Sequence, residues 1–376
     1  MLGGALLLMV ALGVFHAWSL LVAALEVRLG LSRAVVSAVY AVAVGCFAVS
    51  MLMAPGIVRR TTPAVAAAGT GLVAALGLAL VSVGSTWTLW VGYAGLFGIA
   101  NGVGYGLALQ IVQVALPARR GFATSLAVTA YAVGPAAFAP VLELGVRRLG
   151  VLETVAWVAV FVAVVGAVQL PLLAGVRLPV AIDTATDGAS GSTYDRTFWT
   201  LWLCFLLGAA AGLGVLAHAA AVVVDLGGSA AAAALGAAII ALGNAVGRLL
   251  GGSLTDVVAV RWVLAAAGGA GAAALLACVW LGSVGSGLVA VAATGLYYGV
   301  ISSAFPAAVG QWYGVERLSL VYGRLFTAWG MAGLAAPVAA GLAFDRSGSY
   351  DAVLLGAGIA ALGSVVVALA LPRGGR

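Results

Sequence analysis

The chain has 376 residues, of which 64% are hydrophobic and only 7% are charged. An ordinary soluble domain carries about 25% charged residues, so this composition excludes one. The formal net charge is +6, and all 17 basic residues are arginines. Because the positions of these arginines follow a membrane topology, the net charge gives no support to nucleic-acid binding.

Apolar runs follow one another along the whole chain. Each is about 20 residues long, which is enough for a helix to cross a hydrocarbon core about 30 Å thick. The sequence therefore predicts an all-α membrane protein with 12 transmembrane helices. In chain order the predicted spans lie at roughly 3–25, 34–55, 64–84, 88–115, 123–145, 152–175, 197–222, 230–254, 262–282, 286–309, 321–343 and 352–371.

One sizeable polar connection divides these spans into six and six. We expect an N-terminal six-helix half at 1–175, a cytoplasmic central loop at 176–196 and a C-terminal six-helix half at 197–376. The fifth spans of the two halves echo each other, since one reads RGFATSLAVTAYAVGPAAFAP from Arg120 and the other reads RLSLVYGRLFTAWGMAGLAAP from Arg317. In each segment Thr-Ala and an aromatic residue are followed by a stretch that ends in proline. A pattern that recurs in both halves is expected of an internal repeat in a transporter.

The arginines outside the spans predict the orientation. With both termini in the cytoplasm, ten arginines lie on the cytoplasmic side and five on the other, which satisfies the positive-inside rule. We therefore expect a multi-pass protein of the cell inner (plasma) membrane. The cytoplasmic set is Arg59, Arg60, Arg119, Arg120, Arg177, Arg196, Arg261, Arg317, Arg373 and Arg376, and the other set is Arg28, Arg33, Arg147, Arg148 and Arg346.

Glycines recur at four-residue steps in the fourth and eighth spans. Such a step removes the side chains from one helix face and allows a second backbone to approach closely. We therefore expect close helix packing at these positions in preference to a direct contact with a substrate. The glycines are Gly98, Gly102 and Gly106 in the fourth span, and Gly243, Gly247 and Gly251 in the eighth.

Arg248 lies near the centre of the predicted eighth span, inside the apolar segment Ala230–Leu254. A cation at the centre of such a helix costs about 2.5–3.5 kcal/mol on insertion scales, and one kept there usually faces a water-filled path. Asn244 stands four residues earlier and therefore on the same helix face. A structural ion pair is the alternative, but no Asp or Glu lies deep in any predicted span. This pattern favours a substrate role for Arg248.

The stretch around this pair resembles a known transporter family. Residues 243–261 read GNAVGRLLGGSLTDVVAVR, and their Gly252-x-Leu-x-Asp256-x4-Arg261 part is similar to the cytoplasmic signature loop of the major facilitator superfamily. In that family the Asp caps a helix end and pairs with basic residues to hold one conformation. The resemblance therefore implies a gating role for Gly252, Asp256 and Arg261.

Further segments resemble one branch of that superfamily, the oxalate/formate antiporters and monocarboxylate porters. They are the Asn-x-x-Gly-Arg part of the same stretch, GVFHAWSLLVAALEVRLGLSRA in the first span, GVGYGLALQIVQ at 102–113 and YGRLFTAWGMAGLAAPVAAGLAFDRSGSY at 322–350. The resemblance implies alternating access between two six-helix halves around a central substrate site. It also implies a small carboxylate as cargo, with protons or a counter-anion as the coupling partner.

Two positions depart from the family pattern. The first-half signature loop reads MAPGIVRRTTP, with Pro55 about where an acid is expected, which puts gating by that loop in doubt. Oxalate carriers of the branch hold a lysine in the eleventh span, whereas this chain has Trp329 there. Arg324 does not substitute, since it is about 7.5 Å along the axis and about 140° around it. A monocarboxylate with one cationic anchor therefore fits better than a dicarboxylate held between two cations.

Aromatic residues are the remaining candidates for the substrate site. Tyr105 in the fourth span, Tyr298 in the tenth and Trp329 in the eleventh could shape an apolar pocket, with plain packing as the alternative for each. For Tyr297 packing is favoured. His16 in the first span could titrate near neutral pH and bind a proton, or it could be a hydrogen-bonded core histidine.

The sequence thus predicts a secondary active transporter of small organic anions, most consistent with monocarboxylates, working by symport or antiport. The alternative is an efflux carrier for another small solute or a drug. A membrane enzyme is disfavoured because no cluster of metal-binding or nucleophilic side chains is visible. Cys46, Cys204 and Cys278 lie within spans and read as buried apolar residues. We expect no cofactor and no metal site, the lipid bilayer as surroundings, and a monomer.

Overall fold

The computed structural model describes residues 1–179 and 195–372, and every regular element within these ranges is helical. Residues 180–194 of the predicted central loop lie outside the described residues. In chain order the elements are α1 (Leu2–Gly13), η1 (Val14–Leu20), α2 (Val22–Leu29), α3 (Arg33–Ser50), η2 (Met51–Met53), α4 (Ala54–Arg60), α5 (Pro63–Ser82), α6 (Thr86–Leu89), η3 (Trp90–Phe97), α7 (Gly98–Ala115), η4 (Pro117–Arg119), α8 (Arg120–Arg148), α9 (Val151–Leu172), α10 (Arg196–Leu216), α11 (Ala219–Asp225), α12 (Ala230–Thr255), α13 (Val260–Leu281), α14 (Val284–Trp312), α15 (Val315–Ser347) and α16 (Asp351–Leu369).

The spans match the predicted all-α membrane fold. Within the described residues, 10 helices are long and apolar enough to cross a membrane, and the number reaches 12 when each of two bent pairs counts as one span. The second span bends by 52° where α3 passes through η2 into α4. Pro55 explains this bend, because it has no N–H to donate and its ring clashes with the carbonyl four residues earlier, at Met51.

The chain forms two compact units. Among the described residues, the first unit comprises 1–117, 126–179 and 313–324, and the second comprises 118–125, 195–312 and 325–372. The first turns of α15 belong to the first unit, and the rest of that helix belongs to the second. The first turns of α8 belong to the second unit, and the rest of that helix belongs to the first. The two predicted six-helix halves stay a prediction.

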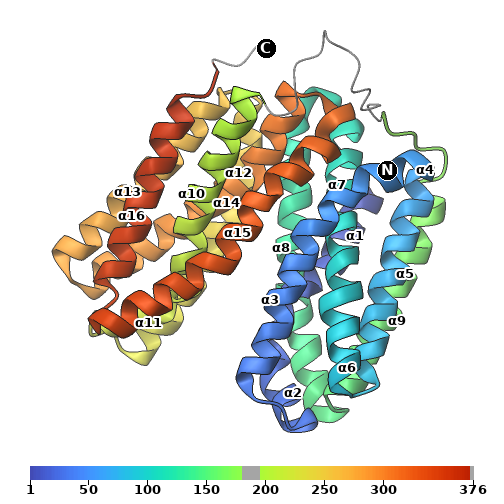
Figure 1. Cartoon of the computed structure of the whole chain (residues 1–376), viewed down its shortest axis with the longest axis horizontal. Helices are drawn as coiled ribbons and strands as arrows, with labels where there is room; N and C mark the ends of the chain where they lie inside the picture. The colour runs from blue at the N-terminus through green and yellow to red at the C-terminus, as the bar shows by residue number, and fades with distance from the viewer. Residues whose placement is uncertain (180–194, 373–376) are drawn as a thin grey trace. The chain divides into compact units, whose positions relative to one another are not determined.

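Neighbouring helices run side by side within each unit (Figure 1). In the first unit α5 packs along α9, and α7 contacts both α1 and α3. In the second unit α14 packs along α12 and α13, while α16 contacts α10 and α13. The α12–α14 pair brings together the span that carries Arg248 and the span that carries Tyr298, one of the tyrosines predicted to lie near it.

Five of the six glycines predicted from the four-residue spacing are points of close packing, whereas a Cβ on Gly106 would meet its nearest atom only at 3.5 Å. A Cβ built on Gly98 of α7 would lie 2.7 Å from the carbonyl oxygen of Ala43, and one on Gly243 of α12 would lie 2.7 Å from that of Ala292. A Cβ on Gly247 would collide with the carbonyl oxygen of Leu296 and lie 2.9 Å from the backbone of α14. Glycine is required here because no other residue permits such an approach.

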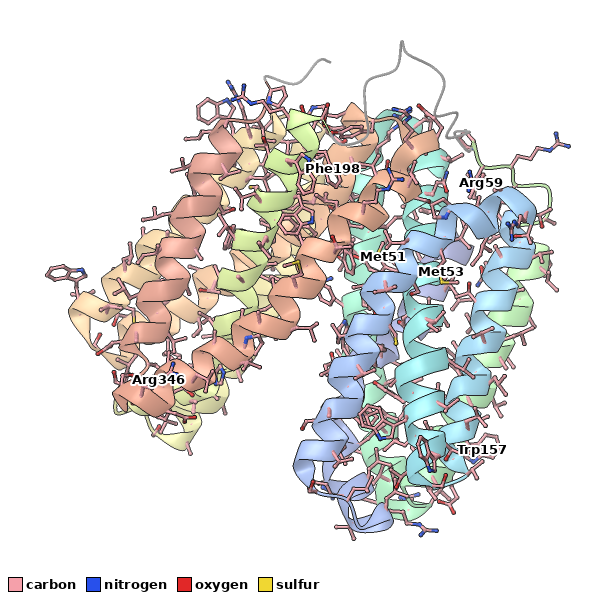
Figure 2. The ribbon with its side chains drawn as sticks, in the orientation of Figure 1. Met51, Met53, Arg59, Trp157, Phe198 and Arg346 are labelled. Carbon is pink, nitrogen blue, oxygen red and sulfur yellow. The ribbon has the colours of Figure 1, made fainter. Side chains whose placement is uncertain are left out.

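Large apolar side chains also cover the outside of the helices. Trp157 on α9, labelled in Figure 2, is 66% exposed, and Trp280 at the end of α13 is 88% exposed. In the second unit Phe198 and Arg346 lie at opposite ends (Figure 2), and the helices of this unit expose apolar side chains such as Leu203 and Leu355. An exposed apolar surface of this extent is expected of a protein whose surroundings are lipid tails.

Gly247→Ala is expected to destabilise the protein by about 1–2 kcal/mol, because the added methyl group forces α12 and α14 apart. Where the added methyl group meets no neighbouring atom, a change from glycine to alanine should stabilise a helix by up to about 1 kcal/mol. Gly269→Ala on α13 supplies that control, since a Cβ there meets nothing within 4 Å. Thermal unfolding of the two purified variants in detergent should therefore shift in opposite directions, and equal shifts would contradict the role given to Gly247.

Candidate functional site

Arg248 lies in the last third of α12. It precedes Thr255, the last residue of the helix, by seven positions, or about 10 Å along the axis. The expectation of a central position is therefore corrected, because α12 ends only at Thr255 and begins at Ala230. An arginine away from the centre of a span costs less than one at the centre, since its long side chain can reach toward the interface.

Asn244 orients the guanidinium group of Arg248. The Nε–H of Arg248 donates a hydrogen bond to Asn244 Oδ1 over 3.0 Å, and both side chains are partly buried. This contact follows from the four-residue spacing predicted from the sequence. Arg248 Cζ also lies 6.0 Å from the ring centroid of Tyr298 on α14, which is at the outer limit of a cation–π interaction. The guanidinium is thus held by its Nε edge and by one aromatic face.

Trp329 on α15 fixes the ring of Tyr298 in turn. Its indole N–H donates to the Tyr298 hydroxyl over 2.8 Å, and its ring stacks on Phe326 with centroids 4.7 Å apart. Tyr298 and Trp329 are both buried. The second unit therefore brings four predicted site residues together, Arg248, Asn244, Tyr298 and Trp329. Tyr297, the neighbour of Tyr298, packs against glycines of α10 and α13, as predicted.

The other two predicted site residues, His16 and Tyr105, belong to the first unit and meet at Tyr131 of α8. The His16 ring lies 5.4 Å from the Tyr131 ring, and the Tyr105 ring lies 5.1 Å from it, both in edge-on geometry. His16 Nδ1 also forms a 2.7 Å hydrogen bond with the hydroxyl of Tyr40 on α3. The first unit thus has its own cluster of polar aromatic side chains.

Two of the three signature-loop residues, Asp256 and Gly252, take part in a helix cap. Both carboxylate oxygens of Asp256, directly after α12, accept hydrogen bonds from the first turn of α8, from Gly121 N over 2.8 Å and from Phe122 N over 2.9 Å. A carboxylate stabilises a helix N-terminus because it meets unpaired N–H groups and the positive end of the helix dipole. Gly252 lets the two segments approach, since a Cβ there would lie 2.7 Å from Ser125 Oγ. Arg261 lies over its neighbour Trp262, with Cζ 4.8 Å from the ring centroid.

His218, the second histidine, lies outside the spans, between α10 and α11. Its Nδ1 is 3.2 Å from the hydroxyl of Tyr350, and the backbone N–H of Tyr350 donates to Asp225 over 2.7 Å. Burial raises the pKa of Tyr350, and the negative charges of Asp225 and Asp345 raise it further. This group ties together the ends of three helices at one edge of the second unit.

The chain resembles known proteins along most of its length. No family model matches it. It is 25% identical over 346 residues to the uncharacterized MFS-type transporter YhjX of Escherichia coli (strain K12), covering 87% of this chain and 84% of YhjX. It superimposes on the E. coli fucose:proton symporter FucP with a TM-score of 0.75, at 17% identity and over 99% of this chain and 98% of FucP. The chain has the major facilitator fold.

A second solved structure gives the same result. A bacterial homologue of the iron transporter ferroportin matches with a TM-score of 0.72, at 17% identity and over 99% of both chains. The relative and the two structures together support a major facilitator transporter in a membrane. The oxalate/formate and monocarboxylate branch within the superfamily stays a prediction, as does the orientation of the termini.

The first unit also contains a hydrogen-bonded pair, Tyr131 and Asn101, that is not among the predicted site residues. Tyr131 donates from its hydroxyl to Asn101 Oδ1 on α7 over 3.0 Å, just as Trp329 donates to Tyr298 on α14. Tyr131 and Trp329 occupy the same place in the Thr-Ala-aromatic repeat of the fifth and eleventh spans. The repeat was therefore a signal that could have identified Tyr131. Asn101 is fully buried, and no local pattern distinguishes it.

Proposed function

We propose that this protein is a secondary active transporter of small organic anions, with monocarboxylates as the favoured cargo and Arg248 as the carboxylate anchor. One observation carries the proposal. An arginine inside an apolar membrane helix is held in a fixed orientation by a neutral amide, Asn244, beside the buried ring of Tyr298. A positive charge kept within a membrane helix has a cost even away from the centre of the span, and it marks a functional site by default.

The chemistry of arginine favours a carboxylate over other cargo. The planar guanidinium presents parallel N–H groups that match the two oxygens of a carboxylate, and its charge does not titrate away. The bond from Arg248 Nε to Asn244 fixes the plane of this fork, so less side-chain entropy is lost when an anion binds. The anion in turn offsets the cost of keeping the cation out of water.

Trp329 and Tyr298 favour a small anion with one carboxylate. Oxalate carriers hold a second cation where this chain has Trp329, and here the indole of Trp329 is bonded to the Tyr298 hydroxyl. Neither aromatic side chain adds a positive charge, so the described contacts around Arg248 provide for a single anionic group. FucP and the ferroportin homologue are named for fucose and for iron, so the fold leaves the cargo open, and the proposal depends on Arg248.

The test is uptake of labelled compounds into vesicles that contain the purified protein. Lactate, pyruvate, acetate and formate represent monocarboxylates, oxalate represents a dicarboxylate, and fucose represents a neutral solute. We expect uptake of at least one monocarboxylate above that of protein-free vesicles, competed by unlabelled monocarboxylates and less well by oxalate. Uptake of fucose with no competition by any carboxylate would contradict the proposal and leave a major facilitator carrier of neutral solutes.

A further inference from the structure

One face of α13 carries an exposed tryptophan at each end. Trp262 in the first turn is 52% exposed, and Trp280 in the last turn is 88% exposed. They are 18 residues apart, which corresponds to about 27 Å and five complete turns, so both lie on the same face of the helix. Tryptophan collects at the two membrane–water interfaces, and the hydrocarbon core between them is about 30 Å thick. The pair therefore marks the levels at which the two bilayer surfaces meet α13.

The exposed residues of this face between the two tryptophans are alanines. They follow one another at steps of three or four residues, which places them in one row along an α-helix. They are Ala266, Ala270, Ala273 and Ala277. This row, called the alanine strip below, is uncharged and apolar along its whole length. Its surface therefore suits contact with a hydrocarbon chain.

Arg261 lies at the Trp262 end of the alanine strip. Its Cζ is 4.8 Å from the ring centroid of Trp262, so the guanidinium lies at the level of one membrane surface. Its Nε–H is buried and has no hydrogen-bond partner among the described residues. A guanidinium carries five N–H donors, and a donor left without an acceptor is costly. The side chain therefore calls for an acceptor from outside the described part of the chain.

The surroundings of Arg261 favour an anionic acceptor. The nearest acid in the sequence, Asp256, directs both of its carboxylate oxygens to the backbone of α8. The first turn of α13 contains no acidic residue, and its N-cap, Ala259, supplies no side-chain cap. The positive end of the helix dipole therefore adds to the charge of Arg261. Val257 and Val258, just before this turn, are exposed apolar residues, as expected of a segment in contact with the lipid interface.

We propose that this end of α13 binds one anionic phospholipid, with Arg261 donating to the phosphate and an acyl chain lying along the alanine strip. The planar guanidinium matches two phosphate oxygens, which makes such a contact both strong and directional. An anionic headgroup is favoured over a zwitterionic one, because the latter brings an ammonium group close to the arginine. The proposal goes beyond the proposed function and does not depend on the identity of the cargo.

A second copy of the chain is the other occupant that an alanine strip suits, since small residues allow two helices to approach closely. Two features favour the lipid. The indoles of Trp262 and Trp280 stand at the ends of the strip and would hold a second helix away from the alanines. In a two-fold dimer within one membrane, the two Arg261 side chains would also lie at the same level and repel each other.

Native mass spectrometry of the full-length protein, released from detergent with added lipid, measures this binding. We expect one phosphatidylglycerol to be retained per chain, more tightly than phosphatidylcholine. Arg261→Gln should weaken the binding of phosphatidylglycerol about fivefold, the effect of one cation beside an anionic lipid surface. Arg59→Gln is the matched control, because it removes an equal charge from an exposed position in the last turn of α4. It should keep the native affinity.

Ala270→Trp tests the acyl-chain contact without a change of charge. Ala270 is nine residues from Arg261, or about 13.5 Å along the axis, which lies within one leaflet of the bilayer. An indole at this exposed position obstructs the strip, so the variant should also bind phosphatidylglycerol more weakly. If Arg261→Gln does not fold, as judged by thermal unfolding without lipid, Arg261→Lys and Ala270→Trp decide, with both expected to bind more weakly than the native protein.

The remaining outcomes identify a different occupant or none. Inorganic phosphate should not displace phosphatidylglycerol, and its displacement of the lipid would assign Arg261 to a soluble anion. A dimer that Ala270→Trp dissociates would assign the strip to a second copy. Native affinity for phosphatidylglycerol in Arg261→Gln, or an equal loss in Arg59→Gln, would overturn the proposal.

Discussion

Replacing Arg248 by glutamine is expected to lower the uptake of a transported monocarboxylate at least about a hundredfold at subsaturating concentration. The change removes a charge-assisted, two-pronged contact, which is stronger than a contact between neutral groups. A hundredfold loss corresponds to about 2.7 kcal/mol, within the range of about 1.5–3 kcal/mol for a hydrogen bond to a charged group. The measurement is initial uptake of labelled substrate into vesicles with equal amounts of reconstituted protein.

Two further variants sharpen this test. Arg248→Lys keeps the charge but loses the planar fork, so its uptake should fall between those of the native protein and Arg248→Gln. Arg147→Gln is the matched control, because the Arg147 side chain is 75% exposed and its 2.7 Å pair with Glu143 lies on the surface of α8. Such surface pairs contribute little, and this variant should transport normally. Normal uptake by Arg248→Gln would make the arginine a structural residue and remove the basis for an anion cargo.

Asp256→Ala is expected to destabilise the protein by about 3 kcal/mol. It removes a carboxylate that accepts from Gly121 N and Phe122 N at the start of α8, and each hydrogen bond to a charged group contributes about 1.5–3 kcal/mol. Asp256→Asn should cost less, because one acceptor oxygen remains after the charge is lost. Thermal unfolding of the purified variants in detergent measures this order.

Asp351 provides the control for that prediction. It is exposed in the first turn of α16, where a carboxylate gains mainly from the helix dipole, at most about 1 kcal/mol. Asp351→Ala should therefore shift the unfolding temperature much less than Asp256→Ala. Equal shifts for the two variants would show that the Asp256 hydrogen bonds do not stabilise the folded protein.

Contacts within one helix could be predicted from the sequence. The hydrogen bond between Arg248 and Asn244 follows from a spacing of four residues, because the α-helical period places both side chains on one face. The glycine faces of α7 and α12 follow from the same helical period. The positions of the spans follow from the hydropathy of the sequence. The bend at Pro55 has an equally local cause, although from the family pattern this proline stands out only as a replacement for an acidic residue.

Contacts between helices were decided only by the tertiary structure. Tyr297 and Tyr298 are adjacent and alike in the sequence, but they point about 100° apart on α14, and only Tyr298 meets Arg248 and Trp329. Asp256 bonds to backbone groups 134 and 135 residues away. These pairings depend on how far one packed helix is rotated and shifted along its axis against another. Many residues each contribute a small part of the packing energy that sets this arrangement. The sequence by itself determined the spans, their apolar and glycine faces and the presence of a cation within one of the spans. The tertiary structure decided which side chains surround that cation.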